Sequence, residues 1–123
     1  MANQADLLAR GREVTTKLWG ERAGAPALPA VQLAPEFFGL VTQFVFGMFW
    51  SRPQLDLRSR SLCTVAQLAA LGKLDELKGH LVGALNLGIT RGELIEVLMQ
   101  TACYAGVPAA VAALNAAAEV LRA

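Results

Sequence analysis

The sequence contains few of the residues that usually carry chemistry. It has 123 residues, with one histidine, two cysteines and 17% charged residues. The cysteines, Cys63 and Cys103, lie far apart among apolar neighbours, so we expect packed, reduced thiols and neither a disulfide nor a metal site. The 11 basic and 10 acidic side chains leave a net charge of +1, which is too small to attract a phosphate backbone. We therefore predict no nucleic-acid partner.

Long apolar runs and a targeting signal are also missing. A membrane span needs about 20 consecutive apolar residues, and the longest candidate, residues 37–50, is shorter and contains Gln43. The first residues do not combine a basic segment with an apolar one, so we predict a cytoplasmic protein without membrane attachment. Yet 54% of the residues are hydrophobic, and the mean hydropathy is +0.42. Because soluble monomers rarely expose large apolar patches, we expect a homo-oligomer.

Alanine and leucine are abundant and no alternating strand pattern persists, which predicts an all-α fold. Proline and glycine divide the chain into about six helical segments within a single domain of residues 1–123. We expect the first helix to be broken by Gly11 and residues 22–34 to form a loop. Thr90 and Glu93 have the spacing of a capping box. The segments predicted to be helical are residues 5–20, 35–51, 56–71, 74–87, 90–104 and 108–121.

His80 is the first candidate for proton transfer, because histidine is the side chain whose ordinary pKa lies nearest neutrality. On a helix it lies beside an apolar stripe that contains Leu77 and Leu81, and Gly83 and Ala84 leave space beside the ring. The alternative is a partly buried histidine that is hydrogen-bonded to a backbone carbonyl. The sequence leaves both interpretations open.

Three arginines, Arg52, Arg58 and Arg60, gather around the start of the third predicted helix. Positive charge near a helix N-terminus opposes the helix dipole, so these side chains need a carboxylate or an anionic ligand. They are therefore candidate substrate-binding residues. The alternative is a set of ion pairs and subunit contacts, which is what surface arginines usually form. We interpret Glu93 as a helix cap on a solvated or ion-paired face.

Four segments, taken together, resemble the carboxymuconolactone decarboxylase family. They are residues 51–53 (Ser-Arg-Pro), 55–62 (Leu-Asp-Leu-Arg-Ser-Arg-Ser-Leu), 80–90 (His-Leu-Val-Gly-Ala-Leu-Asn-Leu-Gly-Ile-Thr) and 104–110 (Tyr-Ala-Gly-Val-Pro-Ala-Ala). The similarity covers most of residues 35–121. It implies the all-helical fold shared with alkylhydroperoxidase D, assembled as trimers or hexamers with pockets near the subunit interfaces.

Within this family, the chain is similar to the decarboxylase branch. The peroxidase branch carries a Cys-x-x-Cys-x-x-x-His motif, and counting back from His80 places Lys73 and Glu76 where its cysteines stand. A dithiol relay needs two sulfurs within bonding reach, so the absence of both cysteines excludes peroxide reduction through this motif. The resemblance to the decarboxylase branch implies decarboxylation of 4-carboxymuconolactone, or of a related lactone, to 3-oxoadipate enol-lactone. This is a step in the breakdown of protocatechuate, an aromatic compound, and it uses no cofactor.

The same chemistry suggests roles for the candidate residues. Loss of carbon dioxide places negative charge on the lactone carbonyl oxygen, and a hydrogen-bond donor at that oxygen lowers the barrier. We hypothesise that His80 donates to this oxygen or returns the proton to carbon, while Arg52, Arg58 or Arg60 holds the acetate group of the dianionic substrate. Two alternatives to this hypothesis stay open. The first is a family member with another small-molecule activity, such as an isomerase or a Cys63-dependent reductase, and the second is a non-catalytic oligomeric binding module.

Overall fold

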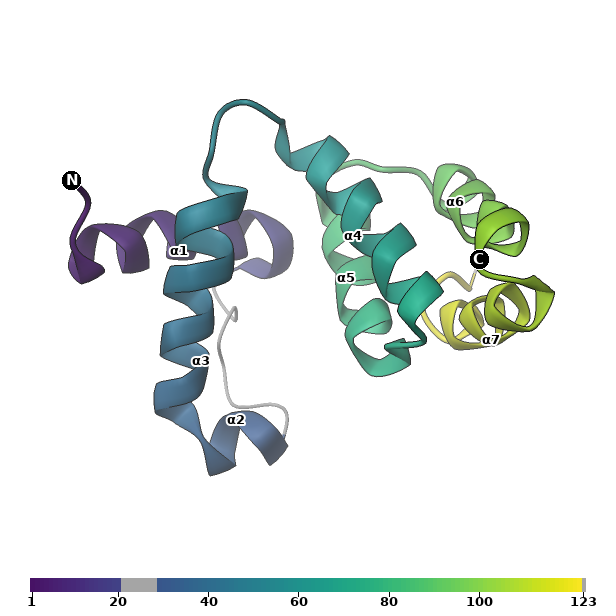
Figure 1. The fold of residues 1–123 in the computed structure, drawn as a ribbon, viewed down its shortest axis with the longest axis horizontal. Helices are drawn as coiled ribbons and strands as arrows, with labels where there is room; N and C mark the ends of the chain where they lie inside the picture. The colour runs from purple at the N-terminus through teal and green to yellow at the C-terminus, as the bar shows by residue number, and fades with distance from the viewer. Residues whose placement is uncertain (21–28, 123) are drawn as a thin grey trace. The chain divides into compact units, whose positions relative to one another are not determined.

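The structure is a computed structural model that describes residues 1–20 and 29–122 (Figure 1). Within those residues it has seven α-helices, one π-helix and no strand, which confirms the predicted all-α class. None of the described helices is both long and apolar enough to cross a bilayer. The chain forms two compact units, the first unit (Met1–Leu55) and the second unit (Asp56–Ala123). The elements are α1 (Gln4–Trp19), α2 (Pro29–Leu33), α3 (Pro35–Val41), the π-helix η2 (Thr42–Trp50), α4 (Leu57–Leu71), α5 (Leu74–Asn86), α6 (Arg91–Tyr104) and α7 (Val107–Ala118).

In the first unit, α1 packs closely against η2, and two glycines make this contact possible. A Cβ atom added at Gly11 would overlap the carbonyl oxygen of Thr42, and one added at Gly47 would overlap the carbonyl oxygen of Leu7. Only a residue without a side chain lets the two backbones approach so closely. The prediction that Gly11 breaks the first helix is therefore wrong. Gly11 lies buried within the continuous helix α1, at the contact with η2.

The large apolar side chains of the first unit divide between an interior and an exposed face. Phe46 and Trp50 are buried, and the ring of Phe46 meets that of Trp19 edge-on, with centroids 5.7 Å apart. The wider turn of the π-helix brings Phe44 and Phe49 together, with ring centroids 5.3 Å apart. We call the exposed side chains along α3 and η2 the aromatic face; its members are Phe37, Leu40, Phe44, Met48 and Phe49.

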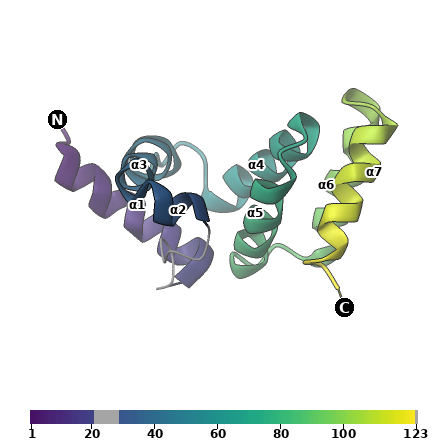
Figure 2. The ribbon, with the colours of Figure 1, turned by 90° about the horizontal axis from the view of Figure 1, so that it is seen from below.

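In the second unit, α4, α5, α6 and α7 surround one contiguous core (Figure 2). α4 begins after Asp56, whose carboxylate accepts a hydrogen bond from the Ser59 N–H at 2.7 Å, and it ends at Gly72 with a left-handed φ of 71°. α6 begins with the predicted capping box, in which Thr90 and Glu93 exchange two hydrogen bonds of 3.1 Å. The core residues are Val65, Ala69, Leu77, Leu81, Ala84, Ile89, Leu94, Leu98, Ala113, Ala117 and Leu121.

Several local predictions are wrong. Pro29–Leu33 forms α2 within the segment predicted as a loop, whose residues 22–28 lie outside the described residues. The apolar segment after Pro35 is not one uniform helix, since α3 gives way to η2 at Thr42, and the last helix ends at Ala118, short of its predicted end. Both cysteines are exposed rather than packed. Apolar neighbours in sequence do not put a side chain on the buried face of a helix, because successive residues point in different directions.

Candidate active site

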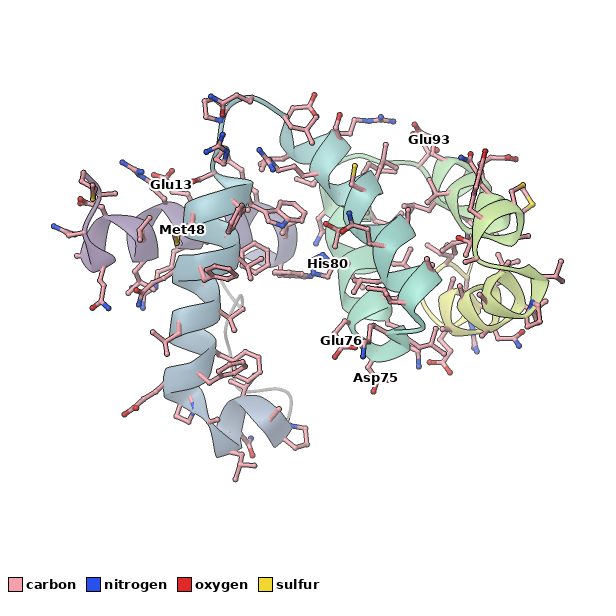
Figure 3. All side chains as sticks on the ribbon, in the orientation of Figure 1. Glu13, Met48, Asp75, Glu76, His80 and Glu93 are labelled. Atoms are coloured by element: carbon pink, nitrogen blue, oxygen red, sulfur yellow. The ribbon has the colours of Figure 1, made fainter. Side chains whose placement is uncertain are left out.

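His80 lies in the middle of α5, at the border of the second unit's core (Figure 3). Leu77 and Ala84, about one turn away on either side, are fully buried, and so is the adjacent Leu81. Glu76, one turn towards the start of the helix, is exposed. The Nδ1 atom of His80 is shielded from solvent. The apolar stripe predicted beside His80 is therefore present, and it holds one edge of the imidazole inside the protein.

Burial decides the protonation state of this imidazole. Removal from water disfavours the charged ring, which lowers the pKa of His80 from 6.5 to about 4. At neutral pH the ring is therefore uncharged, with one N–H to donate and one nitrogen to accept. A neutral imidazole is a very weak acid, but its N–H can still stabilise an oxygen that gains negative charge. The chemistry open to His80 is thus hydrogen-bond donation rather than delivery of a proton from an imidazolium.

Arg58 and Arg60 lie in the first turns of α4, as the sequence predicted. The Arg58 guanidinium forms an ion pair with the Glu93 carboxylate at the start of α6. The pKa of Glu93 is lowered, first by the hydrogen bond from the Thr90 N–H and then by the one from Arg58. The structure thus gives Arg58 a carboxylate partner that ties α4 to α6 and accounts for this residue without a ligand. Arg60 is half-buried on the same helix.

Arg52 belongs to the first unit, whereas Arg58, Arg60 and His80 belong to the second. It follows the end of η2 and lines a hollow of about 430 Å³ together with Arg10 of α1. Two guanidinium groups beside one hollow can bind a small anion. Sequence reasoning missed Arg10, because this residue lies on another helix and belongs to no motif. The remaining lining residues are Leu7, Gly47, Met48, Ser51 and Pro53.

Ser61 of α4 is a second residue to which sequence reasoning gave no role in the reaction. Its side chain is fully buried, and its Oγ has no hydrogen-bond partner among the residues that the structure describes. A signal was present in the sequence. Ser61, Val65 and Ala69 recur every four residues, so the hydroxyl lies in phase with two core positions of one helix face.

Metal-binding and dithiol arrangements are not found in residues 1–20 and 29–122. No three His, Cys, Asp or Glu side chains in these ranges are grouped closely enough to hold a metal ion. The positions that the peroxidase motif would need are occupied by Lys73, at the start of α5, and by Glu76 in its first turn. Cys63 and Cys103, on α4 and α6, are free thiols.

The sequence matches a known family over most of its length. The model of the Carboxymuconolactone decarboxylase family matches residues 35–119. The chain belongs to this family. The match extends from the start of α3 to the end of α7, and it includes His80 together with Arg52, Arg58 and Arg60.

Two proteins similar to this chain carry names of decarboxylases. The 4-carboxymuconolactone decarboxylase of Acinetobacter baylyi is 38% identical over 121 residues, which are 98% of this chain and 90% of that protein. The nitrosuccinic acid decarboxylase npaB of Metarhizium robertsii is 36% identical over 75 residues, which are 61% of this chain and 52% of that protein. The first of these similarities therefore extends over both units.

Proposed function

We propose that this carboxy-lyase decarboxylates 4-carboxymuconolactone to 3-oxoadipate enol-lactone without a cofactor. The observation that carries the proposal is the 38% identity to the Acinetobacter baylyi enzyme over 98% of the chain. Its support within the structure is a histidine that is held neutral at the edge of an apolar core.

The substrate supplies its own electron sink. When the bond between the ring carbon and the carboxylate breaks, its electron pair passes through the ring double bond to the lactone carbonyl oxygen, and carbon dioxide leaves. A proton that comes ultimately from solvent is then added to the ring carbon next to the carbonyl, which gives the enol-lactone. The protein therefore has to stabilise the negative charge on one oxygen and to hold the ring while the charge develops.

His80 fits the first of these tasks. Its neutral imidazole keeps an N–H at every pH well above 4, and the surrounding apolar side chains strengthen a hydrogen bond to a charged oxygen. Direct return of the proton to carbon would need an imidazolium, which burial disfavours. Of the two roles that the sequence suggested for His80, donation to the carbonyl oxygen is therefore the one that we propose.

The acetate group of the substrate needs a cationic partner. We assign this task to Arg52, which shares a hollow with Arg10, or to Arg60, which is half-buried on α4 in the same unit as His80. A guanidinium group binds a carboxylate through two parallel hydrogen bonds, which fixes the orientation of the substrate as well as its affinity. The two arginines lie in different units, and kinetics can separate them.

The experiment measures carbon dioxide release from 4-carboxymuconolactone by the purified protein. We expect His80→Ala to lower kcat by about 10²–10³, because a donor to the developing oxyanion is lost. His80→Gln should recover part of this loss, since its amide offers another N–H. Equal inactivity of the two variants would instead favour proton transfer by His80, and full activity of both would remove His80 from the reaction. A wild-type protein that releases no carbon dioxide would disprove the proposed substrate.

The arginines are tested in the same assay through KM. Arg60→Gln or Arg52→Gln should raise KM about tenfold or more with a smaller change in kcat, depending on which of them holds the acetate. Arg58→Gln is the matched comparison on the same helix as Arg60 and is expected to change KM least. Unchanged KM in both the Arg52 and Arg60 variants would show that neither guanidinium holds the substrate.

A second substrate class has a specific observation in its favour, namely the 36% identity to the nitrosuccinic acid decarboxylase. Nitrosuccinic acid also loses a carboxylate and leaves negative charge on a neighbouring oxygen-rich group, so the same donor would serve. The assay therefore includes nitrosuccinate beside the lactone. Turnover of nitrosuccinate alone would keep the decarboxylase activity and change the substrate.

We further propose that the protein is a homo-oligomer, assembled through the aromatic face of α3 and η2. Its three phenylalanines are 49–58% exposed in the single chain, which is unusual for side chains of this size. The face continues over two helical segments, and burial against another copy would remove it from water. This proposal agrees with the high mean hydropathy of +0.42.

A further inference from the structure

The side-chain hydroxyl of Ser61, on α4, is a buried polar group. The residue is 0% exposed, and its Oγ has no hydrogen-bond partner among the described residues. A buried hydroxyl without a partner has lost its hydrogen bonds to water and gained nothing in return. Most buried side-chain polar atoms are therefore bonded, and an exception calls for an explanation such as a ligand.

Threonine hydroxyls on the helices form a local hydrogen bond that Ser61 lacks. Three threonines each donate a hydrogen bond to the carbonyl oxygen four residues earlier: Thr42 to Phe38 at 2.9 Å, Thr64 to Arg60 at 2.9 Å and Thr101 to Val97 at 3.4 Å. The corresponding carbonyl for Ser61 is that of Leu57, and no such bond forms. Because this local bond is available to any helical serine, its absence leaves the Ser61 hydroxyl with an unused donor inside the second unit.

The position of Ser61 relates it to His80. α4 and α5 pack against each other as a hairpin closed by Gly72 and Lys73. Ser61 stands 11 positions before Gly72 and His80 8 positions after it (72 − 61 and 80 − 72). The two residues are therefore offset by about one helical turn, roughly 5 Å, along neighbouring helices. Two polar atoms of one small carboxylated ring can span such an offset.

From these observations, we propose that the Ser61 hydroxyl donates a hydrogen bond to an oxygen of a small carboxylated substrate, beside the donor His80. Ser61 would then be a further catalytic residue. This inference rests on the proposed decarboxylase function. A neutral hydroxyl suits the task, because it does not titrate in the physiological range and stabilises an anionic oxygen without adding a buried charge.

The experiment compares Ser61→Ala with Thr101→Val and the wild type, using 4-carboxymuconolactone and nitrosuccinate as substrates. We expect Ser61→Ala to lower kcat at least about tenfold with little change in KM, since the bond strengthens in the transition state. Its melting temperature should equal or exceed that of the wild type, because an unbonded polar group is removed. Thr101→Val removes a buried hydroxyl that already has a partner, so it should lose stability and keep kcat.

The outcomes separate the two proposals. If the wild type releases carbon dioxide and Ser61→Ala matches its kcat, the role of Ser61 is wrong while the proposed function stands. A loss of kcat in Ser61→Ala that comes with a lower melting temperature also overturns it, because altered packing would then explain the loss. If the wild type acts on neither substrate, the proposed function itself fails.

Discussion

The two units of this protein treat their large apolar side chains differently. In the second unit, leucines from α5 and α6 are fully buried in one contiguous core. In the first unit, Phe46 and Trp50 are buried, but the aromatic face of α3 and η2 is left exposed. The same kind of sequence, rich in apolar residues at helical spacing, thus produces a closed core in one unit and an open face in the other.

This difference separates the residues proposed for the reaction from the surface proposed for association. The second unit holds the buried polar atoms of His80 and Ser61, whose surroundings set their properties. In the first unit, Gly11 and Gly47 let the backbones of α1 and η2 approach each other closely. The phenylalanines of its aromatic face are exposed, and this is the face that we propose for association.

The largest expected effect comes from substitutions in the aromatic face of the first unit. The double variant Phe37→Ser, Phe44→Ser should dissociate the proposed oligomer, because burial of each phenylalanine contributes about 2 kcal/mol per subunit. Sedimentation velocity measures the change in mass.

The matched control for this prediction is Leu71→Ser, which replaces an exposed apolar residue of the second unit, 70% exposed at the end of α4. It should leave the assembly intact. A wild-type protein that sediments as a monomer, or a double variant that keeps its mass, would contradict the role given to the aromatic face.

A second prediction concerns the buried titratable ring of the second unit. The pKa of His80 is about 4 in the folded chain and 6.5 in the unfolded chain. Between pH 6.5 and 4, His80 is therefore protonated in the unfolded chain and neutral in the folded chain. The free energy of unfolding should therefore be constant above pH 6.5 and fall as the pH is lowered towards 4, by up to about 3 kcal/mol. Urea titrations between pH 8 and 4.5 at constant protein concentration measure this fall.

The control for the pH dependence is His80→Gln, which lacks the titratable ring. The carboxylates with lowered pKa values, such as Glu93, are present in both proteins, so their contribution cancels in the comparison. If the wild type and His80→Gln lose the same stability between pH 7 and 5, the imidazole is not buried in the neutral form.

The smallest of these effects concerns the backbone contact of the first unit. Gly11→Ala would place a methyl group against the Thr42 carbonyl, and we expect it to destabilise the fold by about 2 kcal/mol. Gly39→Ala, on α3, meets no atom within 4 Å and should stabilise by up to about 1 kcal/mol because alanine favours the helix. Urea unfolding followed by circular dichroism tests the pair, and equal stability of the two variants would show that the helices do not meet at Gly11.

Much of the second unit could be predicted from sequence, because its helix ends depend on local interactions. The capping box of Thr90 and Glu93 acts over three residues, and the stop at Gly72 needs only a residue that accepts positive φ. The π-helix η2 and the short α2 were not predicted. Their residues carry no distinctive local signal, and contacts beyond the helix itself select these conformations.

The candidate site was predictable in part. His80 was a candidate because it is the one histidine of the sequence and suited to proton chemistry, and the three arginines were candidates because they surround a helix start. The ion pair of Arg58 with Glu93 joins residues 35 positions apart, so no local pattern showed which arginine would find a carboxylate. The hollow beside Arg52 also depends on Arg10 from a distant helix.

The sequence by itself determined the all-α class, most helix boundaries of the second unit and membership of the carboxymuconolactone decarboxylase family, since each of these depends on residue order and on spacings of a few residues. Only the tertiary structure decided that His80 is neutral, that the buried Ser61 hydroxyl has no hydrogen-bond partner among the described residues and that both cysteines are exposed. The physical reason is that desolvation and hydrogen-bond satisfaction depend on every atom around a group, and the chain brings most of those atoms from positions far away in sequence.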